Sequence, residues 1–218
     1  MFFNIHTHHF QNQGFEIINK EDNPFTDGLF SYGIHPWNAA KWLELEKDFF
    51  AETNNENCLA IGEIGLDKLK GPSIQEQIDV FKAQIAISEQ HQLPVIIHCV
   101  KAWNELKQLK QELKPQQPWI YHGIEKASII DDVLQSGMFV SFGKGLVQNV
   151  KLQEALLKVP LNQLFLETDT ADCSILTLYA FVSKLKNIPL QKLEISIEQN
   201  FKRVFTKWKN GLNEQHFL

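Results

Sequence analysis

Eight short apolar runs alternate along the chain with longer segments of helical periodicity, and this order predicts an α/β protein built as a (β/α)8 barrel. Strands that alternate with helices pair in parallel, and eight parallel strands are the number that such a barrel needs to close. The predicted strands span residues 2–8, 15–19, 29–35, 58–66, 94–99, 119–122, 138–142 and 164–168.

Helical patterns fill most of the later connections between these strands. The longest pattern, 73–91, repeats its apolar residues with the helical period, and Pro72 with Ser73 precedes it as a helix start. Predicted helices cover residues 37–52, 73–91, 102–113, 126–136, 150–158, 175–186 and 195–209.

The first two connections, 10–14 and 20–28, are too short for the usual crossover helix of a parallel pair. We therefore expect a distorted barrel in which either the outer ring is incomplete there or the second strand is misplaced. No linker interrupts the pattern, so residues 1–218 are predicted to form a single domain.

The composition is that of a globular protein, with 44% hydrophobic and 22% charged residues. A net charge of −5 argues against a broad basic surface that wraps duplex nucleic acid, although bound metal ions would still attract phosphates. Three widely spaced cysteines without a C-x-x-C pair favour a reducing, cytoplasmic location. No signal-peptide pattern or apolar run of membrane length is visible, and neither a membrane nor an obligate protein partner is expected.

The first strand carries two histidines whose side chains share one face. His6 and His8 alternate with Ile5 and Thr7, so both imidazoles project to the side on which Asn4 also lies. Two imidazoles on rigid backbone form half of a metal site. A strand that merely happens to carry histidines is equally compatible with this segment alone.

Later strands supply matching groups within or at the ends of apolar runs. Glu63 lies in an apolar strand between Gly62 and Gly65, and a buried carboxylate needs either a salt-bridge partner or a metal. Any single histidine here is more often a core or capping residue than a ligand. The strand ends of a barrel converge on one mouth, however, which favours a metal site made of His6, His8, Glu63, His98, His122 and Asp169.

Four imidazoles and two carboxylates are enough for two divalent ions with open positions for water. Glu63 is the expected bridging carboxylate between them. A closed structural zinc site would need only four ligands and typically uses thiolates, so the surplus favours catalysis.

At this point the sequence resembles the TatD-type metal-dependent deoxyribonucleases, a branch of the amidohydrolase barrels. The resemblance spans nearly the whole chain and implies a distorted TIM barrel that hydrolyses DNA phosphodiesters with zinc, magnesium or manganese, using the same six ligands. The matching segments are Asn4 to His8, Gly33 to Pro36, Gly62 to Asp67, Pro94 to His98, His122, Ser141 to Gly143, Glu167 to Asp169, and Asn200 with Phe205.

Four departures from the family pattern concern the surroundings of the site. Asn4 stands where the family has Asp, which is expected to weaken an acceptor that orients the ligand histidines. Val100 replaces an Arg, Lys68 replaces a Tyr, and Thr170 stands where a proline and a basic loop usually follow. The metal site is thus expected to be complete while the substrate-facing loops are trimmed.

The predicted function is a divalent-metal-dependent phosphodiesterase or deoxyribonuclease that acts through a metal-activated water on DNA or a small phosphodiester. Asp169 is the candidate general base, assisted by Glu63, whereas His35, Lys101 and Lys144 are candidate substrate contacts. Trp37 and Trp103 follow strand ends and could stack a base, although core packing is the commoner role of tryptophan.

Two alternatives remain open from the sequence. The same site would serve hydrolysis of an ester, lactone or amide, which the missing Arg favours. The trimmed loops and Asn4 are also compatible with a non-catalytic barrel whose metal is structural or lost.

Overall fold

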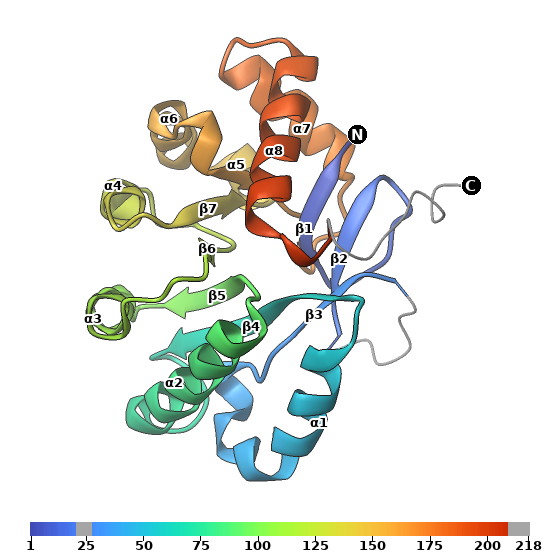
Figure 1. The fold of residues 1–218 in the computed structure, drawn as a ribbon. Helices are drawn as coiled ribbons and strands as arrows, with labels where there is room; N and C mark the ends of the chain where they lie inside the picture. Colours follow the sequence, from blue (N-terminus) through green and yellow to red (C-terminus); the bar gives the residue numbers. More distant parts are fainter. Residues whose placement is uncertain (21–27, 209–218) are drawn as a thin grey trace.

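Eight parallel strands form one sheet in which β1 to β8 follow one another in chain order, in a computed structural model that describes residues 1–20 and 28–208 (Figure 1). The predicted barrel is confirmed, and the predicted strand ends agree with the observed ones to within three residues. The strands are β1 (Phe3–Thr7), β2 (Phe15–Asn19), β3 (Phe30–Tyr32), β4 (Cys58–Asp67), β5 (Val95–Val100), β6 (Trp119–Tyr121), β7 (Phe139–Phe142) and β8 (Leu164–Leu166).

The barrel closes between its first and last strands, just beyond the end of β8. Thr7 and Asp169 form a parallel bridge there. The His8 N–H donates to the Asp169 carbonyl at 3.1 Å, and the Asp169 N–H donates to the His6 carbonyl at 3.1 Å. Because these are the residues predicted to bind metal, closure of the barrel and assembly of the site occur along the same seam.

Helices surround the sheet in the order expected of a βα repeat (Figure 1). Most predicted helices are confirmed, and short α5 and η3 segments were not predicted. The helical segments are η1 (Pro36–Lys41), α1 (Trp42–Asn54), α2 (Ile74–His91), α3 (Trp103–Leu113), η2 (Ala127–Ile129), α4 (Ile130–Gln135), α5 (Gly145–Gln148), α6 (Val150–Lys158), η3 (Leu161–Gln163), α7 (Ile175–Leu185) and α8 (Leu190–Val204).

Two predicted helices have different bounds in the structure. The pattern over 37–52 divides into η1 and α1, because Pro36 and the His35 cap start a tighter 3-10 turn before the α-helix begins. The helix predicted over 195–209 begins earlier, at Leu190 directly after Pro189, and ends at Val204. Its predicted end at Lys209 lies outside the described residues.

The connection between β1 and β2 is short because it contains no crossover helix. β2 pairs with β1 and β3, so the second strand was correctly placed, and residues 8–14 contain no helix. In place of a crossover helix, α8 packs beside β1 (Figure 1). The Phe201 ring of α8 lies 4.6 Å from that of Phe3 and 4.7 Å from that of Phe15, so aromatic packing covers this part of the sheet. The connection from β2 to β3 falls largely outside the described residues.

Helix α2 fixes two strand ends near the barrel mouth through buried glutamines. The Gln77 side chain accepts from the Asp67 N–H at 2.7 Å and donates to the Asp67 carbonyl at 2.9 Å. About two helical turns later, Gln84 accepts from the Ile34 N–H at 2.7 Å and donates to the Ile34 carbonyl at 3.1 Å. These contacts satisfy the backbone where β4 ends and just before His35.

Within the described ranges, none of the helices combines the length and the apolar character that crossing a membrane would require.

Candidate metal centre

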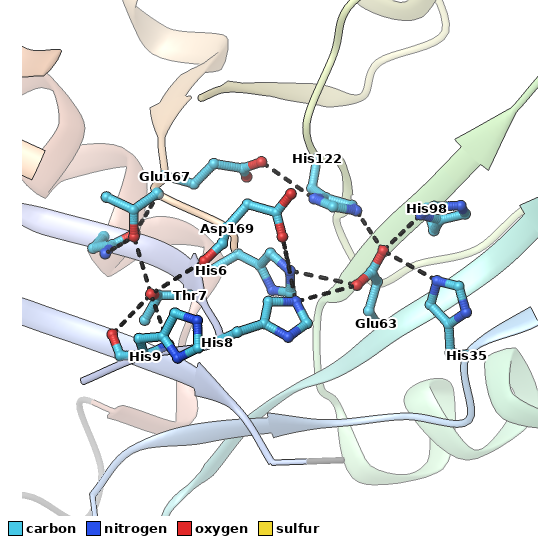
Figure 2. A network of polar contacts seen from close by, with 12 residues as sticks. His6, Thr7, His8, His9, His35, Glu63, His98, His122, Glu167 and Asp169 are labelled. Carbon is cyan, nitrogen blue, oxygen red and sulfur yellow. Dashed lines mark hydrogen bonds and ion pairs between the residues drawn. The ribbon is translucent and has the colours of Figure 1, made fainter. Parts of the chain in front are cut away.

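The structure brings the six predicted ligands together at the mouth formed by the carboxyl ends of the strands (Figure 2). His6 and Glu63 lie within β1 and β4, and His98 lies within β5. His8, His122 and Asp169 lie one to three residues beyond the ends of their strands. Gly65 permits this convergence, because a Cβ on it would lie 1.8 Å from the His98 carbonyl oxygen.

Glu63 lies at the centre and directs its two carboxylate oxygens to different partners (Figure 2). Its Oε1 is 2.7 Å from His98 Nδ1 and 2.7 Å from His122 Nε2. Its Oε2 is 3.5 Å from His6 Nε2 and 3.8 Å from His8 Nε2. This is the arrangement expected of a carboxylate that bridges two ions.

One group of ligand atoms already has the spacing of a coordination shell. Asp169 Oδ1 lies 3.6 Å from His6 Nε2 and 3.3 Å from His8 Nε2, beside Glu63 Oε2. A tetrahedral ion with bonds of about 2.1 Å holds its ligand atoms roughly 3.4 Å apart. In the fully buried His6, Nδ1 has no hydrogen-bond partner, and Nε2 lies between the Glu63 and Asp169 carboxylates without forming a hydrogen bond to either. A buried imidazole in this condition fits a metal ligand, since burial without a partner is otherwise unfavourable.

The second group is closer and is held by hydrogen bonds. His98, His122 and Glu63 Oε1 meet at the 2.7 Å separations given above, and loss of an imidazole proton would free the same nitrogens for a cation. Among the described residues, three groups each bring their potential ligand atoms within 4.8 Å of one another. They are His6 with Glu63 and His122, His6 with His8 and Asp169, and His35 with Glu63 and His98.

Two carboxylates behind the histidines were not assigned from the sequence. Glu167 is fully buried, and its Oε1 lies 3.2 Å from His122 Nδ1. Asp67 Oδ2 lies 3.5 Å from His98 Nε2. Such partners fix the ring orientation and tautomer of a ligand histidine. The available signal was strand alternation, which places Glu167 on the same face as Asp169.

The electrostatics of the metal-free centre are those of a buried ion-pair cluster. Burial raises the pKa of Glu63, but His122 and the other histidines outweigh it and hold the pKa well below its usual value. Burial and the neighbouring His122 lower the pKa of His6, but contacts with Asp169 and Glu63 raise it to about 9. Metal binding must therefore displace protons from this cluster.

Asp169 and His122 follow the same logic. Burial raises the pKa of Asp169, but His6 and His8 outweigh it and hold the pKa below its usual range. Burial lowers the pKa of His122, but Glu63 and Glu167 raise it well above its ordinary value. The backbone of Asp169 is left-handed, with φ of 53°, a conformation that Asp tolerates better than most residues.

Of the predicted substrate contacts, only His35 lines the cavity of about 440 Å³ that contains the metal ligands. Its Nδ1 accepts from the Trp37 N–H at 3.3 Å, and its Nε2 lies 3.5 Å from Glu63 Oε1. Lys101 lines an adjoining cavity of about 640 Å³, and Lys144 lies just before α5. Val100 lines both cavities.

Asn4, expected to be a weaker acceptor for the ligand histidines than the family's Asp, directs its side chain to Thr168. Asn4 Nδ2 donates to Thr168 Oγ1 at 2.8 Å, and Asn4 Oδ1 accepts from the Thr168 N–H at 3.0 Å. The Thr168 hydroxyl donates in turn to Thr7 Oγ1 at 3.0 Å. These bonds link β1 to the segment directly after β8.

The sequence matches a protein family and several curated relatives. Residues 2–206 match the family described as TatD related DNase. A 3'-5' ssDNA/RNA exonuclease TatD of Dickeya dadantii is 31% identical over 144 residues, which cover 63% of this chain and 54% of the relative. An uncharacterized metal-dependent hydrolase, YabD, of Bacillus subtilis is 28% identical over 195 residues, 79% of this chain and 75% of the relative.

Solved structures agree on the fold. The hydrolase TatD family protein from Entamoeba histolytica superimposes with a TM-score of 0.76 at 16% identity, covering 94% of this chain and 98% of that chain. The matched regions span only 54% of the length of the Dickeya relative and 61% of the length of a putative deoxyribonuclease TATDN1 homolog of Vairimorpha ceranae.

Proposed function

Since the chain belongs to the TatD-related DNase family, we propose that it is a divalent-metal-dependent hydrolase of phosphodiester bonds, and specifically a nuclease. The observation that carries this proposal is Glu63, a buried carboxylate with one oxygen toward each of two histidine groups. The Dickeya relative, named as an exonuclease of single-stranded DNA and RNA, supports a nucleic-acid substrate. The single continuous sheet supports one domain over residues 1–218.

Two ions would be held by six side chains. One ion would take His6, His8, Asp169 and Glu63 Oε2, whose spacing matches a coordination shell. The other would take His98, His122 and Glu63 Oε1. The imidazoles of this set suit zinc, and its carboxylates also suit manganese and magnesium. The name of the Bacillus relative supports metal dependence.

Bound ions supply an acidified water and positive charge beside the phosphate. Of the two carboxylates, Asp169 would be the one open to solvent as a general base, because its side chain is 38% exposed whereas that of Glu63 is 6% exposed. Glu63 holds the histidines and stays enclosed. His35 accepts at Nδ1, so its Nε2 carries the proton and can donate to a phosphate oxygen. This favours a substrate role for His35 over a metal-binding one.

Lys101 and Lys144 lie farther out, and we assign them to the strand beyond the reacting phosphate. The cavity that Lys101 lines shares Cys99, Val100, Gly123 and Glu125 with the metal cavity. A strand leaving the metal centre on that side would bring its next phosphate to Lys101. Lys144 stands beyond Gly143, which faces Glu167.

The deciding experiment measures metal content and hydrolysis on the same preparation. Protein purified without chelator is expected to carry zinc or manganese and to hydrolyse a single-stranded oligonucleotide. Asp169→Asn is expected to lower kcat by about 10²–10⁴-fold. Asp172→Asn, an exposed carboxylate of the same loop, is the matched control and retains activity. A folded protein that binds no divalent ion, or that binds ions and cleaves no phosphodiester, contradicts the proposal.

A second candidate function is supported by the cavity lining. The described residues that line the metal cavity include neither lysine nor arginine, and Val100 stands on its wall. This favours a less charged substrate such as an ester, lactone or amide. Assays of lactones, aryl esters and the oligonucleotide separate the two functions. The substrate class with the highest kcat/KM identifies the bond that the site hydrolyses.

A further inference from the structure

Trp37 stands beside the metal ligands in an unusual state for a tryptophan. It is the second residue of η1, directly after Pro36, lines the metal cavity, and is 45% exposed. Trp103 and Trp119 are 8% and 0% exposed and pack in the core. The sequence favoured core packing for tryptophan, which describes Trp103 but not Trp37. Ligand cavities are commonly lined by aromatic side chains, and the exposed surface of Trp37 on this cavity wall is available for such a contact.

The indole is held rigidly although it is exposed. Its Nε1 donates to Asp67 Oδ2 at 2.7 Å, and the Lys70 ammonium lies 3.9 Å from the ring centroid. The His35 ring meets it edge to face at 4.5 Å. A group fixed from several sides loses little conformational entropy when a ligand binds. Trp37 is therefore prepared for a stacking contact.

Because the cavity lining carries little positive charge, an aromatic contact would supply much of the binding of a nucleic-acid strand. Among the described residues of its lining, the ionisable side chains are histidines, the Cys99 thiol and the carboxylates Glu63, Glu125 and Asp169. The described part of the lining contains no lysine or arginine, so the permanent positive charge near the cavity comes from outside it, as from Lys70 on the Trp37 ring and Lys101 of the adjoining cavity. Aromatic stacking is the other general means of holding a single strand, because every base has a π face.

We propose that Trp37 is a stacking platform for one unpaired nucleobase next to the phosphodiester that is cleaved. The inference rests on the proposed nuclease function and deepens it by naming the substrate feature that is recognised. A base held on the indole cannot remain stacked in a duplex, so the platform selects single-stranded ends or frayed termini over paired ones.

Two single-stranded oligonucleotides test the platform. One carries bases on both sides of its 3'-terminal phosphodiester, and the other carries abasic residues at both positions. Trp37→Ala is expected to lower kcat/KM about 5- to 150-fold on the first, the equivalent of ~1–3 kcal/mol of stacking. The loss on the abasic strand is expected to be several-fold smaller. Trp37→Phe keeps a ring and falls between wild type and Trp37→Ala on the first strand.

Leu43→Ala is the matched control, because Leu43 is 84% exposed on the nearby α1 and leaves both rates unchanged. An equal loss on both oligonucleotides overturns the platform, since Trp37 would then act only through Asp67 and His98. Unchanged kcat/KM in Trp37→Ala also overturns it.

Binding without turnover separates this inference from the proposed function. If wild type cleaves neither strand, the nuclease proposal fails, and titration of the intact strands still tests stacking. Quenching of tryptophan fluorescence by the base-containing strand, absent in Trp37→Phe and absent with the abasic strand, supports the platform. Equal quenching in wild type and Trp37→Phe contradicts it.

Discussion

Glu167 shows how much of the centre depends on a single side chain behind the ligands. It is fully buried, its Oε1 lies 3.2 Å from His122 Nδ1, and its Oε2 has no hydrogen-bond partner. An acceptor at Nδ1 keeps the proton on that nitrogen and presents the Nε2 lone pair to a metal. The sequence contains Glu167 within a matching motif, yet its role depends on a cross-strand neighbour that spacing alone does not reveal.

Glu167→Gln is expected to weaken binding of zinc or manganese by about 10- to 100-fold, because a neutral amide orients His122 less strongly than a carboxylate does. Isothermal titration of metal into chelator-treated protein measures the change, and nitrogen NMR of His122 reports its tautomer. Glu154→Gln, an exposed change on α6, is the control. A metal affinity of Glu167→Gln equal to that of wild type would contradict the role of Glu167 in orienting His122.

Asn4 gives a second prediction at the residue scale. Its amide both donates to Thr168 Oγ1 and accepts from the Thr168 N–H, and it is 1% exposed. Asn4→Ala leaves that buried N–H unpaired and is expected to lower the free energy of unfolding by about 1–3 kcal/mol. Urea denaturation of metal-free protein measures the loss. A change below ~0.5 kcal/mol, the range of surface substitutions, contradicts the account.

At the scale of elements, α2 sets the position of two loops that carry functional side chains. Its first turn has a reciprocal capping box between Ser73 and Glu76. From that fixed start, Gln77 and Gln84 reach the backbone at Asp67 and Ile34. The helix pattern was predictable from its apolar stripe, but two glutamines inside a helix give no sign that they face strand ends.

Gln84→Leu is expected to destabilise the protein by about 1–3 kcal/mol for each backbone group that stays unpaired. His35 follows Ile34 directly, so KM for an oligonucleotide is expected to rise as well. Urea denaturation and steady-state kinetics measure the two effects. Gln75→Leu, on the exposed face of the same helix, is the control. Equal effects of both substitutions would show that helix propensity, and not the Ile34 contact, is responsible.

At the scale of the whole molecule, the buried centre links stability to pH and metal. The pKa of His6 is raised from 6.5 to about 9, so its stabilising contribution is complete below pH 6.5 and is lost as pH rises through about 9. The carboxylates Glu63 and Asp169 have lowered pKa values, and their contribution is lost as pH falls below their ordinary range. Metal-free protein is thus most stable in mildly acidic solution.

The increment in Tm that zinc produces is expected to grow between pH 6.5 and about 9, because the metal no longer has to displace the His6 proton. Thermal unfolding with zinc and with chelator, compared at several pH values, measures this increment. An increment that stays flat or falls over this range contradicts the ion-pair description of the metal-free centre.

The overall architecture was predictable because each strand is a compact apolar run and the strand ends carry the ligands. The unusual covering of β1 and β2 was not. Short gaps indicated a missing helix, but Phe3 and Phe15 packing against Phe201 joins residues almost 200 positions apart. No local pattern records such a contact. The use of Asn4 depended in the same way on Thr168, which lies 164 residues away.

The pairing of β1 with the segment after β8 determines when the site can assemble during synthesis. His6 and His8 belong to the first strand, and Asp169 pairs with them only after seven further strands have been added. During translation a ribosome would release some 160 residues before a cation could find its full set of donors. If these residues bind an ion as proposed, its capture would be a late step of maturation that follows the early assembly of the barrel.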